Sequence, residues 1–321
     1  MPTLSYTATG FPDGSPAGLS GTQQLNFTWS ELVWAAITVG RAGVSHVVQF
    51  GLFSAYEIVY RAALVYANIM ETAGAGLFRS AAYDGLDPSE KGAVSYFLGL
   101  TPSKLFAERC LQVPWLLHLD VYRAQLSVVL GPGRSRPDLV GQDCNGEWVV
   151  IESKGRTHGL DAAALEKAKA QSQRVRRISG AVPKFRMGVQ SYFESSRLCL
   201  SIDDPNGYGE IDLPITREMV EHEYYRPFRG WLDESDDVET LAIGDRIYLV
   251  RREPRFDLAV GLDAGRYKRL PTGKIQVAAA ENVPASGDRF VGKDGVLVVL
   301  GTRWSAERMR QQPENRPSLG L

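Results

Sequence analysis

Residues 137–154, PDLVGQDCNGEWVVIESK, are the most informative stretch of the chain. It places a Pro-Asp pair before a short apolar run, an Asn-Gly turn signal, and then the apolar run Trp148–Ile151, which ends in Glu-Ser-Lys. Asn-Gly between two such runs is a strong signal for a β-hairpin. The sequence therefore predicts two antiparallel strands with charged side chains at their open end.

The length of the turn decides which side chains face each other, because side chains alternate between the two faces of a strand. A two-residue turn would place Asp138 opposite Ser153. A three-residue Cys-Asn-Gly turn, with Gly146 in the left-handed conformation, places Asp138 opposite Glu152 instead. We expect this second register, in which Lys154 shares the face of Glu152.

The elements around the hairpin are predicted from apolar periodicity and turn-forming residues. Thr101 or Ser103 is available to cap a first helix, and Asp161 to cap a second. The expected elements are, in order, a helix over Pro102–Gln112, a strand over Tyr122–Leu130, the hairpin, a helix over Asp161–Ile178 and a strand over Phe185–Phe193.

This succession and the Pro-Asp…Glu-x-Lys pattern resemble the PD-(D/E)xK nucleases, also called the restriction-endonuclease-like superfamily. The resemblance covers about a third of the chain, roughly residues 95–200. It implies an α/β (α+β) fold with an αβββαβ core, in which helices flank a mixed central sheet. The helix between the third and fourth core strands would make a right-handed connection.

The resemblance also implies roles for individual residues. Asp138 and Glu152 match the paired metal-binding acids, and Lys154 matches the lysine that orients or activates the attacking water. Glu108 stands where many members carry a further acid, on the helix before the first core strand. Gln171 matches a glutamine of the helix after the motif, within a Lys-x-Gln grouping. The alternatives for these last two roles are Glu57 and Gln173.

The residue types suit phosphodiester hydrolysis. Mg²⁺, with Mn²⁺ as a substitute, binds through one or two carboxylates while keeping several waters. Without an ion, two facing carboxylates repel each other, which raises one pKa. A lysine beside the scissile phosphate would position water and offset negative charge in the transition state.

Each of these residues also has a simpler interpretation. Glu152 and Lys154 can form a solvated strand end, and Asp138 an ordinary turn residue after proline. Glu108, taken alone, resembles an exposed helix residue. His158, in the loop just past the motif, is best interpreted as a solvated histidine.

Basic residues cluster around the motif although the formal net charge of the chain is only −1. A basic rim around an acidic metal centre would suit a phosphate backbone, whereas a solvated helix face is the simpler reading for any single residue. The candidate nucleic-acid-binding residues are Arg134, Arg136, Arg156, Lys167, Lys169 and Arg174.

Composition bounds the remaining possibilities. The chain has 321 residues, 44% of them hydrophobic, which is enough for one large or two ordinary cores. Its three cysteines are widely spaced, so neither a disulfide framework nor a zinc site is indicated. No signal peptide is evident, and the longest uncharged apolar part, Ala42–Tyr56, is too short to span a bilayer. We expect a cytoplasmic protein in which the most hydrophobic region, Leu32–Met70, forms buried helices or part of a dimer interface.

Breaks in composition predict the organisation of the chain. The expected sections are a flexible N-terminus (1–25), a mainly helical section (26–94), the nuclease-like core (95–203), an α+β C-terminal section (204–310) and a loose tail (311–321). The last full section should contain a helix over Thr216–Leu232 and strands over Arg246–Val250, Phe256–Val260 and Gly295–Leu300.

The sequence thus predicts a Mg²⁺-dependent nuclease whose expected substrate is DNA and whose activity would fit defence against foreign DNA, or repair. A homodimer or a partner protein is compatible with this hypothesis. The alternative is a non-catalytic scaffold that keeps the fold and binds nucleic acid or protein.

Overall fold

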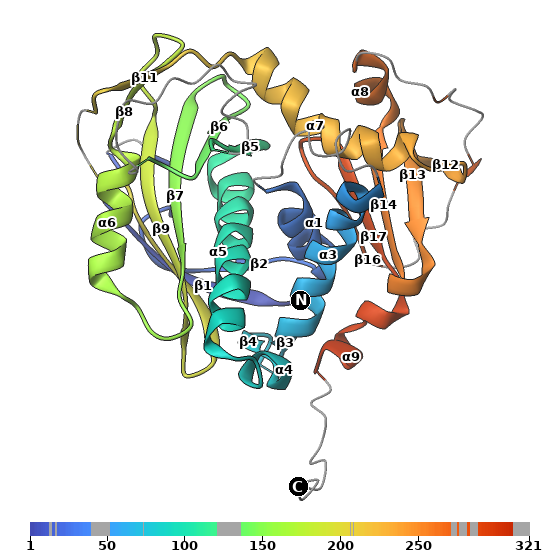
Figure 1. Cartoon of the computed structure of the whole chain (residues 1–321), viewed down its shortest axis with the longest axis horizontal. Coiled ribbons are helices and arrows are strands. Elements are labelled where there is room, and N and C mark those ends of the chain that lie inside the picture. Colours follow the sequence, from blue (N-terminus) through green and yellow to red (C-terminus); the bar gives the residue numbers. More distant parts are fainter. Residues whose placement is uncertain are drawn as a thin grey trace, which may run out of the picture.

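The computed structural model describes residues 1–12, 15–16, 18–39, 52–72, 74–120, 136–205, 207, 209–270, 275, 281–282 and 288–310. It is a mixed α+β structure with two main sheets. Helices lie between the sheets, with the larger sheet on the left in Figure 1 and the smaller one on the right. None of the helices among these residues is long and apolar enough to cross a membrane.

The larger sheet is mixed, because the pairs β7–β9 and β1–β10 are parallel and its other pairs are antiparallel. A short pair, β3 (Ile69–Glu71) and β4 (Leu77–Arg79), attaches to it at β10. The strand order is β2 (Gly21–Asn26), β1 (Thr3–Thr9), β10 (Arg197–Asp203), β9 (Phe185–Glu194), β7 (Trp148–Gly155), β6 (Leu139–Gln142) and β5 (Trp115–His118).

The N-terminal segment is part of this sheet, so the prediction of a flexible section over residues 1–25 is wrong for β1 and β2. Leu4, Tyr6 and Ala8 alternate with more exposed residues and are buried. This alternation is the pattern of a half-buried strand, and it outweighs the Gly and Pro content of the segment as a whole.

Two helices cover opposite faces of the sheet around β7. Helix α5 (Pro88–Leu111) packs so closely that a Cβ added at Gly155 would lie 1.8 Å from the carbonyl oxygen of Ser95. Helix α6 (Ala162–Ser172) lies on the other face, where a Cβ at Gly188 would lie 2.8 Å from the backbone nitrogen of Lys169. Since Glu152 is paired with Gly188, the side chain of Glu152 points to the α6 face.

Helix α5 begins fourteen residues earlier than the sequence predicts, at a capping box formed by Asp87 and Glu90. It continues through Pro102, which cannot donate to the preceding turn. The hydroxyls of Thr101 and Ser103 bond back to the carbonyls of Phe97 and Gly99, so they bind within the helix instead of capping it.

The elements on either side of the hairpin differ in part from the predicted ones. The predicted strand over Tyr122–Leu130 lies outside the described residues, and the strand that pairs with β6 is β5. Asp161 caps α6 as predicted, but the helix ends at Ser172. The residues that follow form a short strand, β8 (Val175–Ile178), because they pair in parallel with β11 (Ile211–Leu213).

The strand predicted over Phe185–Phe193 is confirmed as β9. The order helix, three strands, helix, strand is therefore present as α5, β5, β6, β7, α6 and β9, with β8 inserted after α6.

The C-terminal section confirms the predicted helix and strands, with some shifts in their limits. Its sheet has the order β15-β12-β13-β14-β17-β16. The elements are α7 (Arg217–Asp233), β12 (Val238–Ile243), β13 (Arg246–Glu253), the 3-10 turn Pro254–Phe256, β14 (Leu258–Asp263), α8 (Ala264–Arg269), β15 (Glu281–Asn282), β16 (Asp288–Val291), β17 (Val296–Leu300), the 3-10 turn Thr302–Trp304 and α9 (Ala306–Arg310).

Helices α1 (Trp29–Thr38), α3 (Leu52–Asn68) and α4 (Ala81–Asp84) complete the fold. Helix α7 contacts strands of both sheets, and α1 packs on β16 and β17. A buried polar network joins the two parts. The Asp294 carboxylate accepts hydrogen bonds from the Trp34 indole and the Tyr224 hydroxyl, and the ammonium of Lys104 lies over both of those rings. The tail over 311–321 lies outside the described residues.

Candidate active site at the hairpin

The hairpin has the register that the three-residue turn predicts. Leu139 pairs with Ile151, so the next position places Asp138 opposite Glu152. Gly146 has a φ of +86°, the left-handed conformation that this turn requires and that glycine adopts at little cost. Asp138, Glu152 and Lys154 therefore come together on the α6 face.

The three side chains lie where β7 runs on beyond its partner β6. The β6–β7 ladder ends at Leu139, whereas β7 continues to Gly155 with β9 on its other side. The backbone N–H of Ser153 is therefore free of the β6 ladder, and it donates to the Asp138 carboxylate at 3.0 Å. This bond fixes the first acid beside the second.

The Glu152 side chain is only 1% exposed, and one of its two carboxylate oxygens has a hydrogen-bond partner among the described residues. Its Oε1 accepts a hydrogen bond from the Lys154 ammonium, while its Oε2 is buried with no hydrogen-bond partner among the described residues. Burial, followed by the charge of Asp138, raises the pKa of Glu152 to about 7 against the opposing effect of Lys154. Burial likewise raises the pKa of Asp138, and Lys154 again opposes the shift.

His118 and Tyr96 lie beside Asp138 in the same site, although the sequence patterns do not predict them. Nε2 of His118 lies 3.9 Å from Oδ1 of Asp138 and 2.9 Å from the Tyr96 hydroxyl. Burial lowers the pKa of His118, and its Nδ1 is buried without a hydrogen-bond partner in the described part of the chain. The available signal for His118 is a polar residue directly after the apolar run Trp-Leu-Leu. The sequence around Tyr96 carries no comparable signal.

Glu108 is not part of this group in the structure. Its Oε1 accepts a hydrogen bond from the backbone N–H of Lys293, and its neighbours are Lys104 and Asp294 of the network between the sheets. The physical reason is its direction around α5: Ser103 faces Ser153 of β7, whereas Glu108 lies about 140° further around the helix and points towards the second sheet. The alternative acid, Glu57, forms an ion pair with Arg61.

Gln171 lies on the correct side of the sheet. It is 8% exposed, and its amide nitrogen donates to the carbonyl of Arg136 at 3.2 Å, two residues before Asp138. Its amide oxygen is buried with no partner among the residues that the structure describes. The contact ties α6 to the segment that enters β6, which is a positioning contact. Gln173, the alternative, is the C-cap residue of α6.

Most of the basic residues predicted to bind phosphate are engaged in ion pairs. Arg134 lies outside the described residues, and Lys167 is an exposed residue of α6. The pairs are Arg136 with Asp120, Arg156 with Asp161, Lys169 with Glu166 and Asp203, and Arg174 with Glu210. The rim around the hairpin therefore offers less free positive charge than the sequence predicts.

Asp138 and Glu152 fit a hard divalent cation. The buried Oε2 of Glu152, without a partner in the described structure, is the oxygen that such an ion would satisfy. No cluster of three or more His, Cys, Asp or Glu side chains that could hold a metal occurs in the described ranges. This donor set suits Mg²⁺, because that ion usually binds through one or two carboxylates and keeps several waters.

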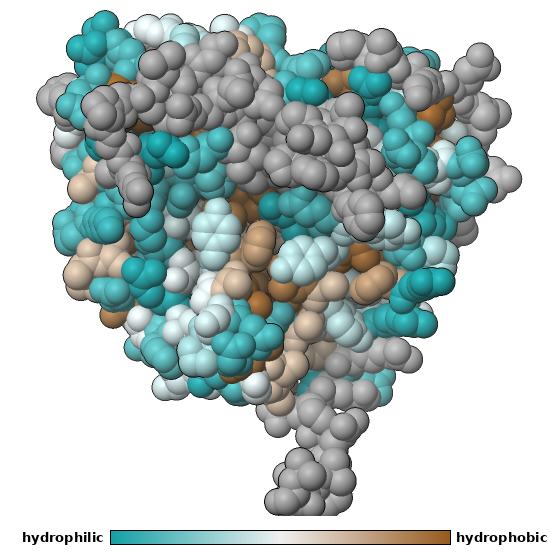
Figure 2. Space-filling model, in the orientation of Figure 1, coloured by the Kyte–Doolittle hydropathy of each residue, from teal (hydrophilic) through white to brown (hydrophobic). Residues whose placement is uncertain are grey.

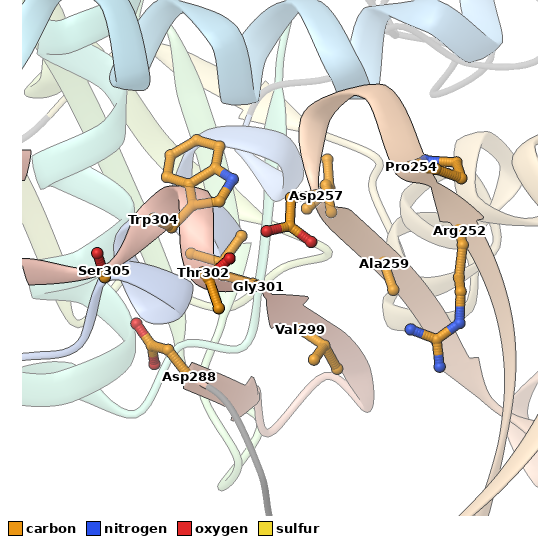
Figure 3. Close-up of a pocket in the computed structure, with 12 residues that line it drawn as sticks. Arg252, Pro254, Asp257, Ala259, Asp288, Val299, Gly301, Thr302, Trp304 and Ser305 are labelled. Carbon is orange, nitrogen blue, oxygen red and sulfur yellow. The ribbon is translucent and has the colours of Figure 1, made fainter. Parts of the chain in front are cut away.

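Another cavity, of about 600 Å³, lies on the C-terminal sheet between β14, β16 and β17. Figure 3 shows Arg252, Asp257 and Asp288 among the residues that line it. Each has a partner already: Glu239 for Arg252, the backbone of Arg303 for Asp257, and Ser30 for Asp288. We assign no function to this cavity.

Comparison of the chain with models of protein families, with curated proteins and with solved structures gives no match.

Proposed function

We propose that this chain is a Mg²⁺-dependent nuclease of the restriction-endonuclease-like class that hydrolyses phosphodiester bonds of DNA. One observation carries the proposal: Asp138 faces Glu152, with Lys154 on the same face and one buried oxygen of Glu152 without a partner in the described structure. The order of α5, β5, β6, β7, α6 and β9 supports the resemblance to that class of nuclease.

Each side chain then has a defined task. Asp138 and Glu152 would hold the metal, which when bound supplies an activated water and neutralises charge on the phosphate. Lys154 donates to Glu152, and its side chain is 23% exposed. From that position it can donate to the attacking water or to a phosphate oxygen, where its charge stabilises the transition state.

The test is cleavage by the purified full chain. Supercoiled plasmid and labelled single strands are incubated with Mg²⁺, with Mn²⁺ and with EDTA, beside Asp138→Ala and Lys154→Ala. Cleavage that needs the metal and is lost in both variants supports the proposal. Metal-dependent cleavage that survives in both variants would contradict it, because the activity would then arise from another site or from a contaminant.

A non-catalytic scaffold is the second candidate, and the ion pairs of the basic rim favour it, because paired charges attract phosphate less strongly. Calorimetry separates the two. Mg²⁺ or Mn²⁺ binding that is lost in Asp138→Ala supports the nuclease, whereas a folded wild-type protein that binds neither ion supports the scaffold.

A further inference from the structure

An aromatic surface lies on α3 and α5 next to the candidate site. It consists of Tyr56 and Tyr60 of α3 and of Tyr96 and Phe97 of α5. The three tyrosines are 48%, 52% and 41% exposed. Tyr56 and Tyr60 are one helical turn apart, so their side chains project from the same side of α3. In Figure 2, apolar and weakly polar side chains gather over α3 and α5 in the middle of the face.

The surface is continuous with the hairpin carboxylates. The rings of Tyr60 and Phe97 are 6.0 Å apart at an interplanar angle of 88°, and the rings of Phe97 and Tyr96 are 5.4 Å apart at 73°. The Tyr96 hydroxyl then contacts His118, whose Nε2 lies 3.9 Å from Asp138. Tyr96 and His118 therefore connect the aromatic surface on the α5 side of the sheet to Asp138, next to the start of β6.

Contacts of Arg61 hold the aromatic surface in place. The Arg61 guanidinium lies 5.4 Å from the centre of the Phe97 ring, is paired with Glu57, and donates to the carbonyl of Val39 at 2.6 Å. Because edge-to-face contacts occupy at most one face of each ring, Tyr60 and Tyr96 keep ring surface available for a ligand.

The chemistry of the surface favours single strands over duplexes. Bases of a single strand stack on aromatic side chains, whereas a duplex hides its bases and presents mainly phosphate. Four of the basic residues expected to attract phosphate are engaged in ion pairs, and the chain has no net positive charge. Stacking is therefore the stronger available source of affinity near this site.

We propose that Tyr56, Tyr60 and Tyr96 bind single-stranded nucleic acid by stacking on its bases and deliver that strand to Asp138 and Glu152. The inference rests on the proposed nuclease function for the fate of the bound strand. Binding itself needs no metal, so it can be measured separately.

The experiment measures fluorescence anisotropy of labelled oligothymidylate and of a labelled blunt hairpin duplex, with the full chain in EDTA. The variants are Tyr60→Leu, Tyr60→Phe and Tyr66→Leu. Phe keeps the ring. Tyr66 is the matched control, because it is an exposed tyrosine of the same helix whose ring contacts Trp304 of the C-terminal section at 4.8 Å. Thermal unfolding checks that each variant is folded.

We expect the wild type to bind the single strand more tightly than the duplex. Tyr60→Leu should weaken strand binding about tenfold, whereas Tyr60→Phe and Tyr66→Leu should bind like the wild type. Equal strand binding by folded Tyr60→Leu, or a preference of the wild type for duplex, would overturn the inference. Self-association of the wild type that Tyr60→Leu abolishes would also overturn it, because the surface would then be an interface between copies.

A parallel cleavage assay keeps the two proposals apart. Binding that depends on Tyr60, without metal-dependent cleavage of any substrate, would leave the strand-binding surface standing and refute the nuclease. Metal-dependent cleavage with strand binding unchanged in Tyr60→Leu would support the nuclease and refute the strand-binding surface.

Discussion

The carboxylate of Asp138 accepts a hydrogen bond from the backbone N–H of Ser153, the residue between Glu152 and Lys154, at 3.0 Å. This bond forms because β7 extends past the end of β6, which leaves an N–H for a side chain to satisfy. A single backbone group therefore holds the two acids side by side, at the cost of mutual repulsion that burial strengthens.

That repulsion predicts how stability depends on pH. The pKa of Glu152 is raised from 4.5 to about 7 in the folded protein, so the folded state binds its proton more tightly than the unfolded state does. The contribution of this group to stability is present below pH 4.5 and is lost as the pH rises towards 7. The raised pKa of Asp138 acts in the same direction.

Urea unfolding at a series of pH values, without divalent metal, measures this loss. Glu152→Gln cannot ionise, so its stability should fall less than that of the wild type across this range, by on the order of 2 to 3 kcal/mol. Other buried acids, such as Asp204 and Asp294, contribute equally to both proteins and cancel in the comparison. If the free energy of unfolding depended on pH in the same way for both proteins, the pKa of Glu152 would not be raised by folding.

Mg²⁺ should reverse the loss of stability with rising pH, because a metal binds the ionised carboxylates and stabilises only the folded protein. We expect the midpoint of thermal unfolding to rise with Mg²⁺ concentration. Below pH 7 the affinity should increase about tenfold for each pH unit, since binding displaces the Glu152 proton, and above it should level off. Asp138→Asn should abolish the effect. A Mg²⁺ response that does not change with pH would mean that the ion binds elsewhere.

The hairpin register and the cap of α6 could be predicted because both follow from local chemistry. Gly146 can adopt the left-handed conformation of the turn, and the Asp161 carboxylate accepts the Ala164 N–H at the start of the helix. The start of α5 was missed because Pro102 resembles a first-turn proline. The helix nevertheless continues through it, and the hydroxyls of the flanking Thr101 and Ser103 bond to carbonyls of the preceding turn.

The orientation of a helix could not be predicted in the same way. Ser103 faces Ser153 across the α5–β7 contact, and Glu108 is five residues later, about 140° further around a helix of 3.6 residues per turn. Glu108 therefore turns towards Lys293 of the other sheet. The acids that neutralise the basic rim were missed for a similar reason. Asp203 and Glu210, for example, are distant in sequence from Lys169 and Arg174.

The contact between α5 and β7 predicts a specific sensitivity to volume. In Gly155→Ala the new Cβ would lie 1.8 Å from the carbonyl oxygen of Ser95, so the helix or the strand must move. We expect a loss of about 1 to 3 kcal/mol in the free energy of unfolding. Cleavage should also be slower, because Tyr96 and Lys154 flank this contact on α5 and β7.

Gly159→Ala is the matched control, since nothing lies within 4 Å of its added Cβ. Its stability should stay within about 0.5 kcal/mol of the wild type in the same denaturant titration. Equal stability of the two alanine variants would show that α5 and β7 are not packed as closely as described.

The assignment of the active site to the hairpin can be tested on two glutamates that the sequence pattern places in one site and the structure separates. Both are buried, at 1% exposure for Glu152 and 3% for Glu108, and Glu→Gln keeps the shape of each side chain. The measurement is the rate of Mg²⁺-dependent cleavage of a labelled single strand. Glu152→Gln should lower the rate by about a hundredfold or more, whereas Glu108→Gln should stay within about twofold of the wild type. Equal losses in the two variants, or full activity of Glu152→Gln, would contradict the assignment of the active site to the hairpin.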